Sequence, residues 1–126
     1  NVRAFILLKP PSLNEEEGVH WAIRSVEYAF DAGVECCSII PTRSGNGIME
    51  QLQEQRIFEP PHVQSMERVL AAGLEMGRGR VFMDLWDAEQ FCSCPECRPA
   101  RLSRLETMNK TQRLVPAVKC TQPGCG

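Results

Sequence analysis

The last third of the sequence concentrates cysteines that are spaced like metal ligands. Five of the seven cysteines lie in this part, as C-x-C-x2-C beginning at Cys92, then 22 intervening residues, then C-x4-C beginning at Cys120. Thiols in short loops on either side of a helix-sized spacer suit tetrahedral metal ligation better than a ladder of disulfides. The spacing therefore predicts that a single ion clips two loops together.

Four thiolates complete a closed zinc site, so one of the five cysteines is spare. We expect two loops with two cysteines each, and the predicted ligands are Cys94, Cys97, Cys120 and Cys125. Cys92 could replace Cys94, since both lie near the same turn. Zn²⁺ is the expected ion. An iron–sulfur cluster on the same thiolates is the competing occupant, because thiolate ligands alone do not discriminate between the two.

Charge is distributed unevenly along the chain. Residues 1–96 hold 8 basic and 15 acidic side chains, a net of −7, whereas residues 97–126 hold 6 basic and 1 acidic, a net of +5. Arg98, Arg101 and Arg104 step around a short predicted helix, where we expect a basic outer surface. Such a tail could approach an anionic partner such as RNA, or it could be a solvated helix beside an acidic body.

Hydrophobic patterning predicts alternating strands and helices. Apolar runs typical of strands occupy 2–8, 34–40 and 80–86, and the first has the pattern of a strand buried on both faces. Asn14 and Glu17 form a capping-box pattern at the start of a helix that Gly33 ends. Further helices are expected at 48–55 and from Val63 to near Gly77.

Helical crossovers between apolar strands imply parallel pairing and an α/β class. We therefore expect three parallel strands that form the C-terminal half of a partial (β/α) barrel over residues 1–90. Residues 91–126 are expected to form a small Cys-rich metal-binding tail with a basic helix.

Ligands of parallel α/β proteins bind at the carboxyl ends of the strands. Polar clusters fall there at 9–11, 41–47 and 84–87. The glycine-bearing run 41–47 could hold a polar cofactor group, with Arg43 pairing a carboxylate, or it could be an ordinary turn. Asp84 and Asp87 are candidate proton acceptors or ribose ligands, although Asp84 could instead bond to neighbouring backbone.

Other residues with chemical potential have simpler interpretations. Trp86 could stack on a base, but we expect it to pack in the core. Cys36 and Cys37 are expected to be small buried hydrophobes. His20 and His62 lack partners at ligand spacing and are expected at the surface or half-buried.

Several short runs together resemble the second half of radical S-adenosylmethionine (radical SAM) enzymes, most nearly the archaeosine-biosynthesis type related to the elongator catalytic subunit. They are FILLKPP at 5–11, LNEEE at 13–17, AFDAGVE at 29–35, IIP at 39–41, GIME at 47–50 and PP at 60–61. The resemblance spans most of residues 2–90 and rests on the pattern along the length, without one diagnostic motif.

The resemblance implies a partial (β/α)6 barrel that reductively cleaves S-adenosylmethionine at a [4Fe–4S] cluster and then abstracts hydrogen from a substrate, with tRNA a candidate. It implies that 41–49 matches the late-strand turn that helps to hold the adenosyl moiety. The cofactor-binding candidates are Thr42, Arg43 and Asn46 in that turn and Lys9 at a neighbouring strand end. The stretch 84–87 lies at another strand end, and its two aspartates are the catalytic candidates.

One feature of the family is absent from these 126 residues. The C-x3-C-x2-C cluster loop does not occur, and the cysteines at 92–97 follow the last strand instead of the first. The chain is therefore expected to be a fragment that works with the missing N-terminal half of the barrel.

Two other functions stay open at this point. One is a non-catalytic zinc-ribbon-like module that binds RNA or protein, and the other is a cluster-independent α/β-barrel lyase using a lysine and a carboxylate. No run approaches the roughly 18 apolar residues of a membrane span, so no membrane partner is expected. Free thiols at metal-ligand spacing predict a cytoplasmic location.

Overall fold

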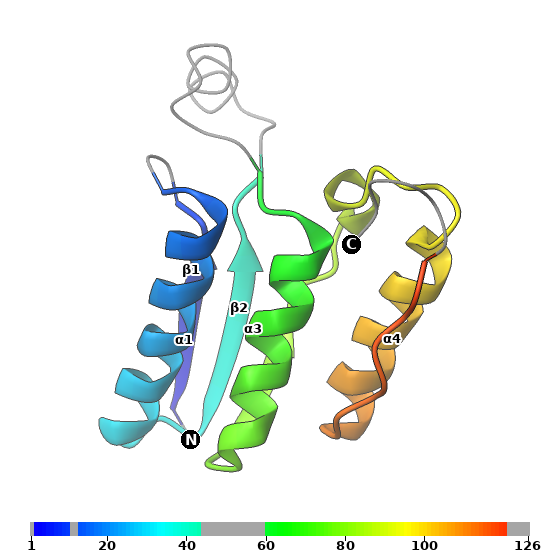
Figure 1. The fold of residues 1–126 in the computed structure, drawn as a ribbon. Coiled ribbons are helices and arrows are strands. Elements are labelled where there is room, and N and C mark those ends of the chain that lie inside the picture. Colours follow the sequence, from blue (N-terminus) through cyan, green and yellow to red (C-terminus); the bar gives the residue numbers. More distant parts are fainter. Residues whose placement is uncertain (1, 11–12, 44–59, 121–126) are drawn as a thin grey trace.

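The computed structural model describes residues 2–10, 13–43 and 60–120, and it forms an open α/β structure (Figure 1). The elements in chain order are β1 (Arg3–Leu8), α1 (Glu15–Asp31), β2 (Cys36–Pro41), α3 (Val63–Met76), β3 (Arg80–Met83), the 3-10 helix η1 (Ala88–Phe91) and α4 (Arg98–Thr111). The strands pair in parallel in the order β1-β2-β3. The expected class and the three parallel strands are confirmed. The helix expected at 48–55 lies outside the described residues.

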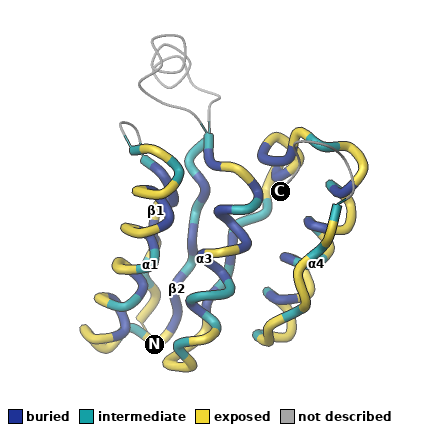
Figure 2. Tube along the Cα trace, viewed as in Figure 1, coloured by how far each residue is buried: buried dark blue, intermediate teal, exposed yellow. Residues whose placement is uncertain are grey.

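Helices α1 and α3 lie side by side on one face of the sheet (Figure 1). Their inner faces are buried against the strands, as the dark segments in Figure 2 show. Ile39 on β2 and Val81 on β3 are fully buried there, as are Val26 and Leu70 on the two helices. Removing this apolar surface from water is the main contribution to the stability of the fold.

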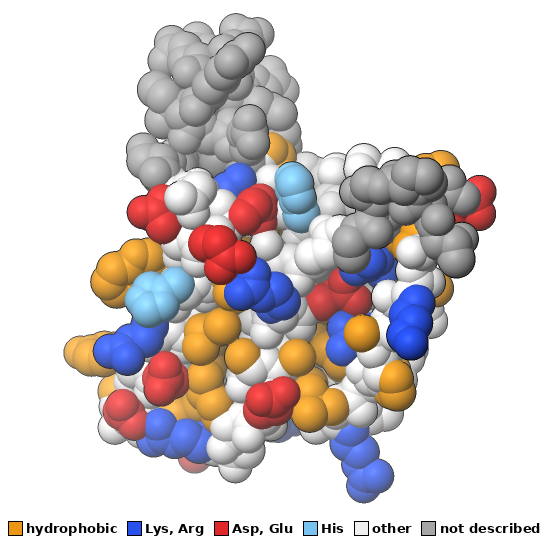
Figure 3. All heavy atoms as spheres, viewed as in Figure 1, with side chains coloured by type: hydrophobic (Ala, Val, Ile, Leu, Met, Phe, Trp, Pro, Cys, Tyr) orange, Lys and Arg blue, Asp and Glu red, His pale blue; other side chains and the backbone are white. Residues whose placement is uncertain are grey.

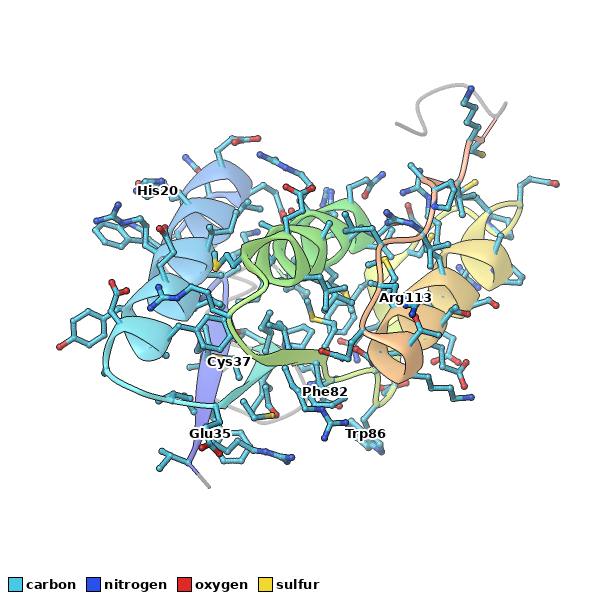
Figure 4. The ribbon with its side chains drawn as sticks, turned by 90° about the horizontal axis from the view of Figure 1, so that it is seen from below. His20, Glu35, Cys37, Phe82, Trp86 and Arg113 are labelled. Carbon is cyan, nitrogen blue, oxygen red and sulfur yellow. The ribbon has the colours of Figure 1, made fainter. Side chains whose placement is uncertain are left out.

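The opposite face of the sheet carries apolar side chains that the described residues leave uncovered. Phe5 and Leu7 of β1 are 68% and 56% exposed. Figure 4 shows Phe82 of β3 and Trp86 on the same side, away from the helices. The expectation that the first strand is buried on both faces is therefore wrong within the described structure, because helices cover only one of them.

The helix ends follow the sequence signals closely. Asn14 accepts from the backbone amide of Glu17 at 2.8 Å, and the Glu17 carboxylate accepts from the amide of Asn14 at 3.1 Å, so the capping box is confirmed. Helix α1 ends at Asp31, two residues before Gly33. Gly77 caps α3 with φ of 62°, a left-handed conformation that glycine adopts without steric cost.

Strand β3 is shorter than the apolar run 80–86 suggests. It ends at Met83, and the Asp84 carboxylate then accepts from the backbone amide of Trp86 at 3.0 Å. This local side-chain bond favours a turn over continued strand. Asp84 and Trp86 consequently lie beyond the strand, at the carboxyl edge of the sheet.

Helix α4 packs beside α3 and the outer edge of β3. Leu105 and Met108 of α4 are fully buried, and with Phe91 they belong to the same apolar cluster as the strands. The described part of the tail is thus packed onto the sheet.

Charged side chains of both signs are interspersed over the face formed by α1 and α3 (Figure 3). Two exposed ion pairs lie on this part of the structure, Glu16–Arg68 at 2.8 Å and Asp31–Arg78 at 2.6 Å. None of the described helices is long and apolar enough to cross a membrane.

Candidate functional site

Three of the four predicted metal ligands come together in the tail. The sulfur atoms of Cys94, Cys97 and Cys120 all lie within 4.8 Å of one another, and those of Cys94 and Cys120 are 3.7 Å apart. Cys94 precedes α4, Cys97 is the residue at its start, and Cys120 follows it in the segment that returns along the helix. The structure therefore forms a cysteine cluster that could bind a metal ion.

The spacing of the sulfurs fits a single tetrahedral ion. With Zn–S bonds of about 2.3 Å, tetrahedral geometry places the sulfurs about 3.8 Å apart, close to the 3.7 Å between Cys94 and Cys120. In a [4Fe–4S] cube each thiolate binds a different iron at a separate corner, so its sulfurs must stand further apart. The geometry favours one ion over a cluster.

Two further cysteines are candidates for a fourth ligand if an ion binds there. Cys125 lies outside the described residues. Cys92 is buried beside the cluster, with its sulfur 3.6 Å from the carbonyl oxygen of Cys94. Burial raises the pKa of the Cys92 thiol, and the neighbouring Cys97 raises it further. Cys92 is therefore a neutral thiol near neutral pH unless an ion stabilises its thiolate.

The arginines of α4 point inward, so the expected basic outer surface is wrong for this part of the helix. Arg101 is 4% exposed; its Nε donates to the Cys97 sulfur at 3.2 Å and its Nη1 to the Glu67 carboxylate at 2.5 Å. Arg104 donates to the other oxygen of Glu67 at 2.9 Å. The Nε of Arg98 donates to the carbonyl oxygen of Cys92 at 2.8 Å. A buried acid on α3 draws two of these cations toward the core.

The sequence did not lead us to predict a role for Glu67, although its position in the helix pattern carried a signal. It lies four residues after Val63 and three before Leu70, within the buried apolar stripe of α3. An acid at such a position needs a partner from elsewhere in the chain. Burial alone would lower the pKa of Arg101, but its hydrogen bonds to Cys97 and Glu67 outweigh burial and raise it. Arg101 is therefore always charged.

Lys9 stands at the carboxyl end of β1 and is already paired. It is 4% exposed, and its ammonium lies 3.1 Å from Oε1 of Glu15. The other oxygen of Glu15 accepts from the Ser65 hydroxyl and, at 3.4 Å, from the amide of His62. Burial raises the pKa of Glu15, but Ser65, Lys9 and His62 together lower it below its usual range. Glu15 thereby joins β1, α1 and α3.

The backbone around Lys9 is constrained. Lys9 has φ of 58°, in the left-handed region that costs energy for a residue with a side chain. Gly18 of α1 faces it so closely that a Cβ added there would stand 2.9 Å from the Lys9 Cβ. This approach lets the start of α1 close over the end of β1.

Arg43 and Thr42 hold the strand ends together. The Thr42 hydroxyl donates to the carbonyl oxygen of Leu8 at 3.0 Å. The Arg43 guanidinium makes five hydrogen bonds, to the carbonyl oxygens of Pro41, Asp84 and twice Trp86 and to the Asp84 carboxylate. Five is the number of its N–H donors. Arg43 is thus arranged to position β2 against β3, which leaves no donor for a cofactor carboxylate in this conformation.

The carboxylates predicted as catalytic lie in the turn after β3. One oxygen of the Asp84 carboxylate accepts from Arg43 and the other accepts from the backbone amide of Trp86. The second bond is the one to neighbouring backbone that the sequence offered as an alternative to a catalytic role. Asp87 has φ of 52° and accepts from the Gln90 side chain at 3.0 Å. Asn46, the remaining cofactor-binding candidate, lies outside the described residues.

Trp86 is 71% exposed, so the expectation of core packing is wrong. Its backbone bonds to Arg43 and Asp84 fix it outside the core, and the Arg43 guanidinium lies 5.6 Å from its ring. By contrast, Cys36 and Cys37 are buried and His20 and His62 are exposed, as the sequence indicated.

Comparison with known protein families, with curated proteins and with solved structures finds no match to this chain.

Proposed function

We propose that this chain is the C-terminal portion of a radical SAM enzyme, with a zinc ion fixing its tail. The observation that supports the enzyme proposal most is the form of the sheet. Three parallel strands follow one another in chain order, and in the part of the chain that the structure describes α1 and α3 lie on the same face. This arrangement supports the barrel proposal, because in a (β/α) barrel the helices form the outer layer and the other face of the sheet lines the interior.

The two edges of the sheet support the same interpretation. Helix α4 covers the outer edge of β3, whereas in the described part of the chain no strand pairs with the outer edge of β1. Parallel sheets normally have both faces covered. Additional strands would therefore pair with β1 and curl over Phe5 and Leu7, as preceding β/α units of a barrel would do. This N-terminal half of the barrel is the proposed partner.

The strand ends support a ligand site at the barrel mouth. Lys9, Thr42 and Asp84 follow three neighbouring strands and therefore share the carboxyl edge of the sheet, where ligands of such folds bind. Arg43 would hold the ends of β2 and β3 in position through its bonds to Pro41, Asp84 and Trp86. The exposed Trp86 ring would be available to stack on a base of the ligand. A [4Fe–4S] cluster on a C-x3-C-x2-C loop outside these 126 residues would supply the electron for S-adenosylmethionine cleavage.

The test uses a longer polypeptide in which a C-x3-C-x2-C loop precedes residue 1 of this chain. After anaerobic reconstitution with iron and sulfide and reduction with dithionite, we expect S-adenosylmethionine to yield 5′-deoxyadenosine. Asp84→Asn should lower this yield at least tenfold, whereas Asp31→Asn, in an exposed ion pair on α1, should not. Absence of 5′-deoxyadenosine from the reconstituted protein would refute the enzyme proposal.

The zinc proposal is supported by the spacing of the thiols. Cys94, Cys97 and Cys120 would supply three thiolates and Cys92 or Cys125 the fourth, giving a closed structural site. Such an ion would tie the segment after α4 back to the start of that helix. The site is separate from the proposed catalytic cluster, so each part of the proposal can fail without the other.

A further inference from the structure

We propose that the buried series Glu67–Arg101–Cys97 couples metal binding in the tail to the packing of α4 on α3, with Arg101 as a positioning residue for the thiolate site. This inference rests on the proposed metal site. It does not depend on the radical SAM proposal.

The series connects two helices through charged groups that water hardly reaches. The side chains of Arg101 and Glu67 are 5% and 8% exposed. Nε of Arg101 faces the Cys97 sulfur at 3.2 Å while its Nη1 faces Glu67 on α3 at 2.5 Å. One guanidinium therefore bonds a predicted metal ligand on one side and a distant helix on the other.

Glu67 fixes the position of Arg101. Both of its oxygens are used, one by Arg101 and the other by Arg104 at 2.9 Å. The planar guanidinium cannot turn toward Glu67 without also setting the direction of its Nε. Glu67 thus determines the orientation of the N–H that points at Cys97, although its own hydrogen bonds are to Arg101 and Arg104.

The cation is placed where a metal–thiolate site needs one. Four thiolates around a divalent ion carry a net charge of −2, and a buried negative charge is unfavourable unless hydrogen bonds and cations compensate it. Arg101 supplies both at Cys97. Groups that orient metal ligands in this way typically change metal affinity by about 10- to 100-fold when they are removed.

Coupling of this kind is reciprocal. If Glu67 strengthens zinc binding through Arg101, then bound zinc must strengthen the contact between α4 and α3 by the same factor. Metal binding in the tail would consequently stabilise the packing of α4, the helix that covers the outer edge of β3, against α3.

The experiment measures zinc affinity of the full 126-residue chain by competition with a chromophoric chelator, and the absorption of the Co²⁺-loaded protein. We expect Glu67→Gln to weaken zinc binding about tenfold and to reduce the rise in melting temperature that zinc produces. Glu16→Gln is the matched control, because it also breaks a Glu–Arg pair between two helices, here an exposed one between α1 and α3. It should leave zinc affinity unchanged.

Arg101→Lys is the second variant. It keeps the positive charge, but its ammonium cannot reproduce the fixed pair of donors that the guanidinium directs at Cys97 and at Glu67. It should weaken zinc binding and shift the thiolate-to-cobalt absorption band, and it serves as the test if Glu67→Gln does not fold. Equal zinc affinity in wild type and in either folded variant would overturn the coupling. A wild-type chain that binds no zinc would instead refute the metal site itself, and 5′-deoxyadenosine formation would remain a separate result.

Discussion

The side-chain amide of Asn109 pairs with both backbone groups of Met83, accepting from its N–H at 2.8 Å and donating to its C=O at 2.9 Å. Gln112 does the same one turn later with Val81, at 2.9 and 2.8 Å. Two carboxamides, one in the last turn of α4 and one directly after it, thus take the place of a fourth strand along β3. They satisfy an edge that would otherwise present unpaired donors and acceptors.

Replacing Asn109 by Ala should destabilise the protein by about 2 kcal/mol, because two part-buried backbone groups of Met83 lose their partners. Chemical denaturation followed by circular dichroism measures this. Thr111→Ala, which removes an exposed hydroxyl at the end of the same helix, is the control and should cost under about 0.5 kcal/mol. Equal losses in the two variants would show that the edge contacts contribute nothing.

The identity of the fourth sulfur ligand can be decided by substitution. Serine at Cys94, Cys97 or Cys120 should each weaken zinc binding strongly, because these thiols lie within 4.8 Å of one another. Only one of Cys92→Ser and Cys125→Ser should do the same, and that residue is the fourth ligand. Cys36→Ala, in the buried strand β2, is the control. Unchanged zinc affinity after loss of Cys97 would contradict the proposed site.

Glu15 makes stability depend on pH in a defined direction. Its pKa is lowered in the folded protein from an ordinary value of 4.5, since Ser65, Lys9 and His62 outweigh the effect of burial. A carboxylate of this kind contributes stability above pH 4.5, and the contribution is lost as the pH falls through the lowered pKa. Wild type should therefore lose stability steeply in acid.

Glu15→Gln should cost about 2 kcal/mol at pH 7, because the buried Lys9 ammonium loses its carboxylate. The difference from wild type should shrink as the pH approaches 3. Denaturation curves from pH 3 to 7 test this, with Glu75→Gln, an exposed position on α3, as the control. A difference that does not change with pH would mean that the charge of Glu15 is unimportant.

Arg43→Lys should loosen the ends of β2 and β3, because an ammonium cannot reproduce five hydrogen bonds in one plane. We expect a loss of about 2 kcal/mol and a more mobile Trp86. Fluorescence anisotropy in a Trp21→Phe background reports on Trp86 alone. The exposed Arg24→Lys should change neither quantity, and an unaltered Trp86 signal in Arg43→Lys would contradict the positioning role.

Local chemistry accounts for what the sequence could predict. The capping box at Asn14 follows from short-range spacing and the parallel strands from regular periodicity. Cys120 is distant in sequence from Cys94 and Cys97, but the grouping of these cysteines at metal-ligand spacing indicated that they converge.

The features that the sequence did not reveal depend on contacts between distant residues. Arg101 points inward because Glu67 lies 34 residues away on another helix, and a charge on a helix normally indicates solvent. Trp86 is exposed because Arg43 holds its backbone from a position 43 residues earlier. The described residues leave one side of β1 uncovered. That exposure depends on which elements flank the sheet, and an apolar run cannot indicate them.

The most direct measurement is the metal content of the purified 126-residue chain, by elemental analysis together with native mass spectrometry. Tetrahedral sulfur spacing in the tail predicts one zinc per chain, bound more weakly after Cys97→Ser. Stoichiometric iron with acid-labile sulfide, or a metal-free chain whose tail thiols are all freely alkylated, would contradict it.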